Sequence, residues 1–159
     1  MQFQTTISGE VHGETVIRGK KLTDLIGTTD YVSTLFLLLT GVVPTPNHLA
    51  VLNAILVACS EHGVASASGF IPRVVAASGN ETTHALAAGV LAIGPYHGGA
   101  IEGAMEFFKS FAGKSETEVA AVIHAMREAK QRAPGFGHKV YTTIDPRAEK
   151  LIVVAGEHK

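Results

Sequence analysis

The 159-residue sequence contains one cysteine, Cys59, and no tryptophan. A single cysteine cannot form a disulfide within the chain, and it argues against a metal site built from cysteine ligands. Because Cys59 follows an apolar run, we expect it to be buried as a small hydrophobic residue. Aromatic residues make up only 6% of the chain, whereas 46% of all residues are hydrophobic. The core of this single domain is therefore expected to consist mainly of Ala, Val, Leu and Ile.

The chain also lacks a long apolar segment and a strong charge of either sign. Its longest aliphatic run, Leu35 to Leu39, is far shorter than the roughly 20 residues that a membrane-spanning helix needs. Residues Met1 to Thr6 have neither the basic nor the apolar part of a signal peptide. The formal net charge of −1 provides no overall attraction to nucleic acid. We therefore predict a cytoplasmic protein that binds neither membranes nor nucleic acid.

Turn and capping residues predict an all-α domain with a short N-terminal β-hairpin. Residues Phe3–Val11 and Thr15–Arg18 are rich in β-branched and polar side chains and flank His12-Gly13-Glu14, which suits a hairpin. Five helices are expected from their capping signals: Tyr31–Thr40 after Asp30 and before Gly41, Pro46 to about Cys59 after Thr45, Thr82–Ile93, Glu116 to about Arg132 after Ser115, and Pro146 onwards after Asp145. We expect residues 1–159 to form one region, with a hairpin over 1–20 and a helical body over 21–159.

Two segments rich in Ala, Gly and Ser, Ala65–Ser78 and Ala85–Gly94, also have helical character. Small side chains let helix backbones approach closely. The sequence leaves open whether this close packing occurs inside the molecule or across a dimer interface.

The most informative segment is Pro134–Tyr141, which is followed closely by Asp145-Pro146-Arg147. Its two glycines and its proline give a backbone that a ligand can approach closely. His138 can polarise a carbonyl group, and Arg147 can clamp a carboxylate with its planar fork of donors. The segment therefore indicates a small anionic ligand that carries both groups, with a plain surface arginine as the alternative for Arg147.

Two further histidines lie at breaks between helices, where side chains from different elements can meet in a cleft. His97 lies in Gly94–Ala100, just before an expected helix whose positive end disfavours an imidazolium. A neutral imidazole there can donate its N–H to a developing enolate oxygen. His62 has a simpler interpretation as a helix-terminal histidine. A metal site of His62, His97 and His138 is a weaker alternative, because the histidine spacing does not match known metal-binding motifs.

These segments resemble, in order along the chain, the motifs of the citrate synthase superfamily, and most closely those of its short citryl-CoA lyase-type members. The resemblance covers nearly the whole chain, and its last two motifs are specific. The matching segments are Val16–Lys20 (family Ile-Arg-Gly-Tyr), Leu37–Pro46 (Leu-Leu-x-Gly-x-x-Pro-Thr), Glu61–Ala67 (Asp-His-x-x-Asn-Ala-Ser), Gly94–Ala100 (Gly-Pro-Leu-His-Gly-Gly-Ala) and Pro134–Arg147 (Pro-Gly-Phe-Gly-His-Arg-Val-Tyr followed by Asp-Pro-Arg).

The resemblance implies a mostly α-helical homodimer of tricarboxylic acid metabolism, without a metal or a permanently bound cofactor. Such an enzyme would form or cleave the C–C bond between acetyl-CoA and oxaloacetate through an enol, with acetyl-CoA or citryl-CoA, and oxaloacetate or citrate, as its small-molecule substrates. The catalytic residues would be His97, which stabilises the enol of the thioester, and His138, which polarises the oxaloacetate carbonyl. Arg147 and His62 would bind the acid. The residues implied to border coenzyme A are Ala133, Pro134, Gly135, Phe136 and Gly137.

The resemblance also implies that the family's base, an aspartate, lies well beyond the Asp-Pro-Arg motif, whereas this chain ends at Lys159. Loss of an acid–base group costs about 10²–10⁴-fold in rate. We therefore expect a C-terminally truncated member that is inactive as this chain alone. Several questions stay open: whether the reaction runs as a synthase or as a lyase, whether the acceptor is oxaloacetate or a close 2-oxo acid, and whether the chain is a fragment of a longer enzyme or a natural remnant. The alternative function is a non-catalytic module that binds a dicarboxylate and coenzyme A.

Overall fold

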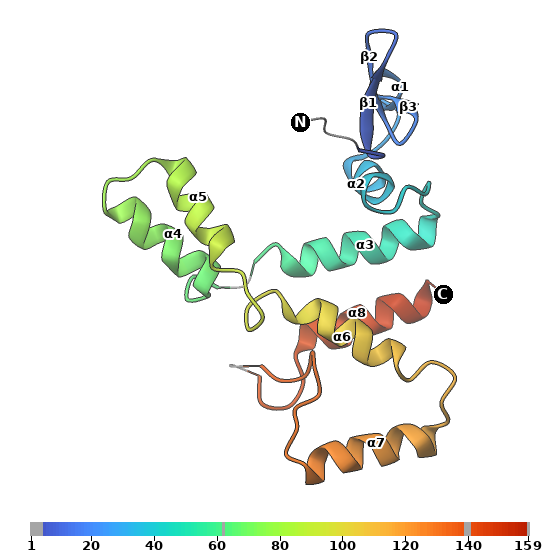
Figure 1. Cartoon of the computed structure of the whole chain (residues 1–159), viewed down its shortest axis with the longest axis vertical. Coiled ribbons are helices and arrows are strands. Elements are labelled where there is room, and N and C mark those ends of the chain that lie inside the picture. The colour runs from blue at the N-terminus through green and yellow to red at the C-terminus, as the bar shows by residue number, and fades with distance from the viewer. Residues whose placement is uncertain (1–4, 62, 139–140, 159) are drawn as a thin grey trace. The chain divides into compact units, whose positions relative to one another are not determined.

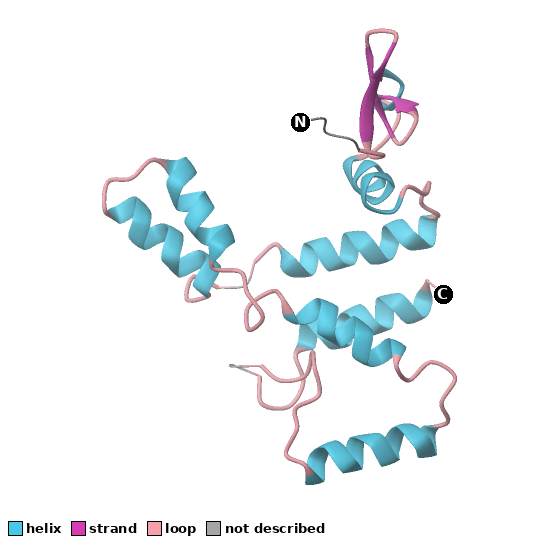
Figure 2. Ribbon diagram, viewed as in Figure 1, coloured by secondary structure: helices cyan, strands magenta, loops and turns pink. Residues whose placement is uncertain are grey.

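A computed structural model describes residues 5–61, 63–138 and 141–158. Over these residues the chain forms eight helices and a three-stranded sheet, with the strands confined to the N-terminal part (Figures 1 and 2). The contacts group the chain into two compact units, Met1–Glu61 together with Ile144–Lys159, and His62–Thr143. No helix in the described part of the chain is long and apolar enough to cross a membrane.

The N-terminal sheet contains the predicted hairpin and one additional strand. Strand β1 (Ser8–Val11) pairs antiparallel with β2 (Glu14–Ile17), so that Val11 faces Glu14 across the turn. A third strand, β3 (Lys20–Lys21), pairs with the other edge of β2. The hairpin is confirmed, but β1 begins only at Ser8, and β3 was missed because two residues are too few to show an alternating pattern.

Four helices belong to the first unit: α1 (Leu22–Leu25), α2 (Tyr31–Thr40), α3 (Pro46–Cys59) and α8 (Pro146–Glu157). The predicted bounds of α2 and α3 are confirmed. Asp30 accepts a hydrogen bond from the Ser33 backbone N–H at 2.9 Å, and its hydrogen bonds to Ser33 lower the pKa of its carboxyl group. The Arg18 guanidinium donates to the Leu38 carbonyl at 2.8 and 3.1 Å, which ties the end of β2 to the last turn of α2.

Helix α3 packs against α2 and α8, yet its last turn lies at the surface. The expectation that Cys59 is buried is therefore wrong, because the thiol is exposed. The preceding apolar residues Ile55, Leu56 and Val57 are exposed as well, so the apolar run marks a surface rather than a core.

The second unit contains α4 (Ala67–Ala77), α5 (Thr82–Leu91), α6 (Ala100–Lys109) and α7 (Glu116–Glu128). Helices α4 and α5 pack side by side (Figure 1). A Cβ atom added to Gly89 would lie 2.7 Å from Cγ of Pro72 and 3.1 Å from the carbonyl oxygen of Ser68. The small residues of these two helices therefore provide close backbone packing inside the unit.

Helix α7 begins with the predicted capping box. The Ser115 hydroxyl accepts from the Glu118 backbone N–H at 3.3 Å, and the Glu118 carboxylate accepts from the Ser115 N–H at 2.8 Å, which lowers the pKa of Glu118. The helix ends at Glu128 rather than near Arg132, because Lys130 adopts a left-handed backbone with φ 52° and Gln131 bonds back to the Met126 carbonyl. This is a Schellman ending without its usual glycine, so no glycine marks the end of the helix in the sequence. Helix α5 likewise ends at Leu91, two residues before the predicted Ile93.

We predict that Gly89→Ala lowers the free energy of unfolding by about 1–3 kcal/mol, because the added methyl group overlaps Pro72 and forces α4 and α5 apart. Urea denaturation followed by circular dichroism measures this change. Gly156→Ala is the matched control, since no atom lies within 4 Å of a Cβ at this helical position. Alanine there should leave stability unchanged or raise it by up to about 1 kcal/mol. Equal stability of Gly89→Ala and wild type would contradict the predicted close packing.

Candidate functional site

His97 lies in a tight turn between α5 and α6. The Gly94 and His97 backbones bond to each other in both directions, at 2.8 and 2.9 Å, and the Gly99 N–H also donates to the Gly94 carbonyl. Helix α6 begins at Ala100 with Gly99 as its N-cap. The turn therefore holds the half-buried imidazole of His97 just ahead of α6, as the sequence predicted.

Hydrogen bonds from the start of α4 fix the donor nitrogen of this imidazole. The Ser68 backbone N–H donates to Nε2 of His97 at 3.3 Å, and the Ser68 hydroxyl oxygen lies 2.8 Å from the same nitrogen. A neutral imidazole has one N–H and one bare acceptor nitrogen. Because Nε2 is the acceptor, Nδ1 carries the proton of the neutral ring. Nδ1 is therefore the nitrogen that can donate to a ligand oxygen.

His138 has the opposite arrangement. The Tyr141 backbone N–H donates to its Nδ1 at 3.2 Å, and the two rings lie 4.8 Å apart between centroids. Nδ1 is therefore the acceptor, and Nε2 carries the proton of the neutral ring. The imidazole is exposed, which suits a side chain that meets a ligand from solution.

The loop at residues 133–137 packs on α6. Gly135 has a left-handed backbone with φ +80°, and a Cβ atom added to it would lie only 2.6 Å from Cβ of Ala104. The Phe136 ring lies 5.8 Å from the Phe108 ring, between centroids. Only glycine combines this backbone with this approach, so Gly135 lets the loop lie directly against the helix.

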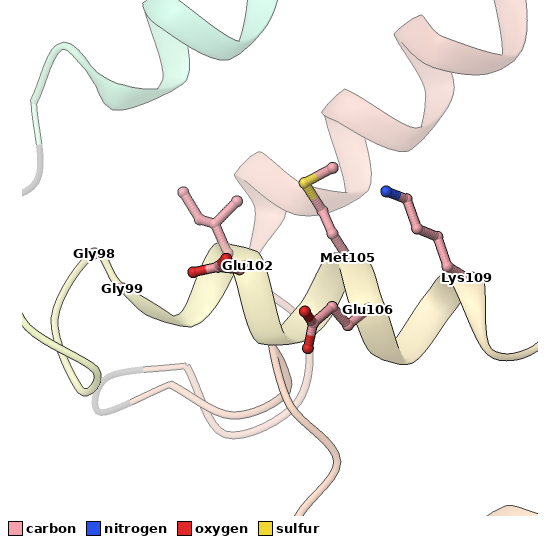
Figure 3. Close-up of a pocket in the computed structure, with 7 residues that line it drawn as sticks. Gly98, Gly99, Glu102, Met105, Glu106 and Lys109 are labelled. Carbon is pink, nitrogen blue, oxygen red and sulfur yellow. The ribbon is translucent and has the colours of Figure 1, made fainter.

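A hollow of about 510 Å³ opens along another part of α6. Its lining combines two backbone glycines with one helical surface: Gly98, Gly99, Ile101, Glu102, Met105, Glu106 and Lys109. Figure 3 shows Met105 and Lys109 projecting from the same side of the helix. This lining of one cation, two carboxylates and apolar groups lies next to the His97 turn in sequence and was not predicted.

Arg147 lies in the first unit, in the first turn of α8, and its guanidinium forms a two-pronged ion pair with Asp145. The Arg147 Nε and Nη2 atoms donate to the two Asp145 oxygens at 3.0 and 2.7 Å. Asp145 also accepts from the Arg147 backbone N–H at 2.9 Å, which confirms it as the N-cap of α8. Asp145 thus occupies the Nε–Nη2 edge of the guanidinium in the two-pronged geometry with which arginine binds a carboxylate.

The structure adds residues that the motifs did not indicate and leaves one predicted residue undescribed. Ser68, Ala104 and Phe108 were missed, although the i, i+4 spacing of Ala104 and Phe108 was a signal that they share a helix face. His62 lies outside the described residues, and so does the metal hypothesis that includes it. In the part of the chain that is described, no group of three or more His, Cys, Asp or Glu residues could hold a metal ion.

Comparison with known proteins gives consistent matches. Residues 44–159 match the family described as "Citrate synthase, C-terminal domain". Putative citrate synthase 2 of Mycobacterium tuberculosis is 33% identical over 113 residues, which cover 70% of this chain and 30% of that protein. Citryl-CoA lyase from Hydrogenobacter thermophilus matches with a TM-score of 0.88 at 36% identity, over 98% of this chain and 60% of that one. ATP citrate lyase from Methanosaeta concilii in complex with (3S)-citryl-CoA matches with a TM-score of 0.86 at 26% identity, over 99% and 26%. The chain thus spans less than two thirds of the length of each of these proteins.

We predict that the neutral rings of His97 and His138 are opposite tautomers, with the proton on Nδ1 in His97 and on Nε2 in His138. Long-range ¹H–¹⁵N correlation spectra distinguish protonated from bare ring nitrogens, and His124 on the exposed face of α7 provides a reference. Finding the same tautomer in His97 and His138 would show that one of the two backbone hydrogen bonds is wrong.

Proposed function

The chain belongs to the citrate synthase family, and on that basis we propose that it carries the substrate-recognition elements of an enzyme that forms or cleaves the C–C bond between acetyl-CoA and oxaloacetate. The family resemblance and the helical fold class predicted from the motifs are confirmed. A solved relative named for citryl-CoA lyase activity and another that holds (3S)-citryl-CoA support this choice of substrates.

The pattern of donor nitrogens on the two histidines is the observation that carries the proposal. The chemistry needs two separate N–H donors, one for each substrate oxygen that gains charge. Nδ1–H of His97 would donate to the thioester oxygen, and Nε2–H of His138 would donate to the carbonyl oxygen of oxaloacetate. A neutral imidazole suits both positions, because it donates without requiring a charged ring beside a CoA thioester.

In the direction of synthesis, loss of a methyl proton from acetyl-CoA places negative charge on the thioester oxygen, where His97 stabilises the enol. The methyl carbon then forms a bond to the carbonyl carbon of oxaloacetate, and the carbonyl oxygen next to His138 takes up a proton to become the hydroxyl of citryl-CoA. Cleavage reverses these steps. Citrate synthesis also requires water to hydrolyse the thioester. We assign no residue of this chain as the base that removes the methyl proton.

The remaining assignments concern binding. We propose that Arg147 clamps a carboxylate of the acid, which would take the place of Asp145 on the same two-pronged edge of the guanidinium. The loop of Ala133, Pro134, Gly135, Phe136 and Gly137 would border coenzyme A. The role of His62 in holding the acid and the cytoplasmic location stay predictions.

We also propose a homodimer that forms through the α4–α5 pair. The outer surfaces of these helices carry large apolar side chains that are mostly or half exposed: Phe70 (56%), Val74 (49%), Leu86 (64%) and Val90 (68%). Each helix contributes an i, i+4 pair, so the apolar groups form a stripe along both helices. A soluble protein rarely leaves such a surface in water, and a second copy would cover it.

We predict that oxaloacetate binds to the chain and that His138→Ala and Arg147→Ala each weaken binding by about 10–100-fold, since each removes a hydrogen bond to a charged or polarised oxygen. Isothermal titration calorimetry measures these affinities. The matched controls are His124→Ala and Arg73→Ala, which remove exposed side chains of the same types. If all five proteins bind equally, or none binds, the acid site is wrong.

Turnover decides between the enzyme and the alternative of a non-catalytic binding module. The chain is incubated with citryl-CoA, and separately with acetyl-CoA plus oxaloacetate, and the products are separated by chromatography. Product formation in either mixture supports the enzyme. Binding without product in both supports the binding module for this chain.

For the dimer, we predict that wild type sediments as a dimer and that Leu86→Glu with Val90→Glu gives a monomer, because two carboxylates on the stripe would be buried without partners. Analytical ultracentrifugation measures the mass. Val122→Glu on α7 places a charge on a different exposed aliphatic residue and should leave the dimer intact. A monomeric wild type would refute the proposed interface.

A further inference from the structure

The loop at residues 133–137 is attached to α6 at two points that are one helical turn apart. At the first point, Gly135 approaches Ala104 so closely that an added Cβ atom would lie 2.6 Å from the alanine Cβ. The neighbouring Gly103 also lies near the loop, since a Cβ atom added to it would be 3.7 Å from Cβ of Pro134. The helix side of this contact therefore has to be small.

The second point is an aromatic pair. The rings of Phe108 and Phe136 lie 5.8 Å apart at an angle of 58°, a tilted arrangement that aromatic pairs favour. The Phe107 ring lies 6.1 Å from the Phe108 ring and packs edge-on against Phe111 at 4.8 Å, so Phe111 is one ring further from the loop. Phe108 and Phe136 are 57% and 61% exposed, so burial alone does not hold the Phe136 ring in place.

Helix α6 connects these contacts to the His97 turn. It begins at Ala100, directly after Gly98 and Gly99, and Ala104 and Phe108 follow at i and i+4 on one face. An α-helix is rigid, with a rise of about 1.5 Å per residue, so residues on one face keep fixed distances from the turn at its start. A loop attached at Ala104 and Phe108 is thus held at a set distance from His97.

We propose that Ala104 and Phe108 are positioning residues that hold the 133–137 loop at the correct distance from His97 for a CoA thioester. This inference rests on the proposed function, in which the loop borders coenzyme A and His97 contacts the thioester oxygen. Neither side chain has to touch the substrate. Ala104 lets the loop backbone lie against the helix, and Phe108 fixes the Phe136 ring and with it the conformation of the loop.

The test compares three variants of the full chain. Phe108→Ala removes the pairing ring, Phe108→Tyr retains it, and Phe111→Ala removes a nearby ring that packs against Phe107 instead. Two-dimensional ¹H–¹⁵N spectra of the ligand-free proteins report the Gly135 and Gly137 amides. Calorimetry with coenzyme A reports binding. Unchanged amide signals in α4 and α5 show that each variant is folded.

We expect Phe108→Ala to shift both loop amides and to weaken coenzyme A binding by about two- to tenfold, the range of an aromatic pair. Phe108→Tyr should keep both measurements at those of wild type, and Phe111→Ala should leave both unchanged. Ala104→Val gives a second route to the same result. It leaves the aromatic pair in place and pushes the loop outward through Gly135, so both amides should shift and binding should weaken.

Loop amides that keep their wild-type positions in both Phe108→Ala and Ala104→Val would overturn the positioning role, whatever the affinity for coenzyme A. Shifted amides with unchanged affinity would overturn the link between the loop and the ligand. If wild type does not bind coenzyme A although the amides shift as expected, the thioester part of the proposed function fails while the anchoring on α6 stands.

Discussion

The approach of the Gly135 backbone to Ala104 is the contact on which the arrangement of the site depends. It is possible only because Gly135 has no side chain and Ala104 has a short one. Through this contact, a loop that is distant in sequence becomes attached to the helix that also begins at the His97 turn. Helix α6 therefore supports both the His97 turn and the loop at residues 133–137, which belong to separate sequence motifs. A larger residue at position 104 would separate the loop from the helix without altering any residue that is proposed to meet a ligand.

Backbone hydrogen bonds select the tautomers of His97 and His138. The Ser68 N–H engages Nε2 of His97, and the Tyr141 N–H engages Nδ1 of His138. A backbone donor cannot lose its proton, so each bond selects one tautomer of the neutral ring and leaves the other nitrogen as the donor. Arg147 is oriented in a similar way, by a side chain two residues away. In each case a neighbouring residue determines how the donor atoms of the motif residue are arranged.

Much of the fold was predictable because capping is a local property. Asp30, Thr45, Ser115 and Asp145 each accept a hydrogen bond from a backbone N–H two or three residues later, as their sequence contexts predicted. The errors have local causes too. Helix α7 ends through a left-handed Lys130, where the sequence has no glycine, and strand β3 is too short to show a pattern. Cys59 was misplaced because an apolar run alone does not say which surface covers it, and the last turn of α3 is exposed.

By itself the sequence determined the family and the helical fold class, and it predicted His97, His138, Arg147 and the glycine-rich loop as the candidate site, because these depend on residue type and on order along the chain. The tertiary structure decided which nitrogen of each histidine donates and which helix supports the loop. The tautomer of His138 depends on Tyr141, three positions away. The tautomer of His97 and the position of the loop depend on Ser68, Ala104 and Phe108, which meet their partners 28 to 31 positions away in the chain, as between Ser68 and His97 with a separation of 29. Such long-range contacts form only when the start of α4 meets the His97 turn and the loop meets α6, and residue order alone does not specify which segments meet.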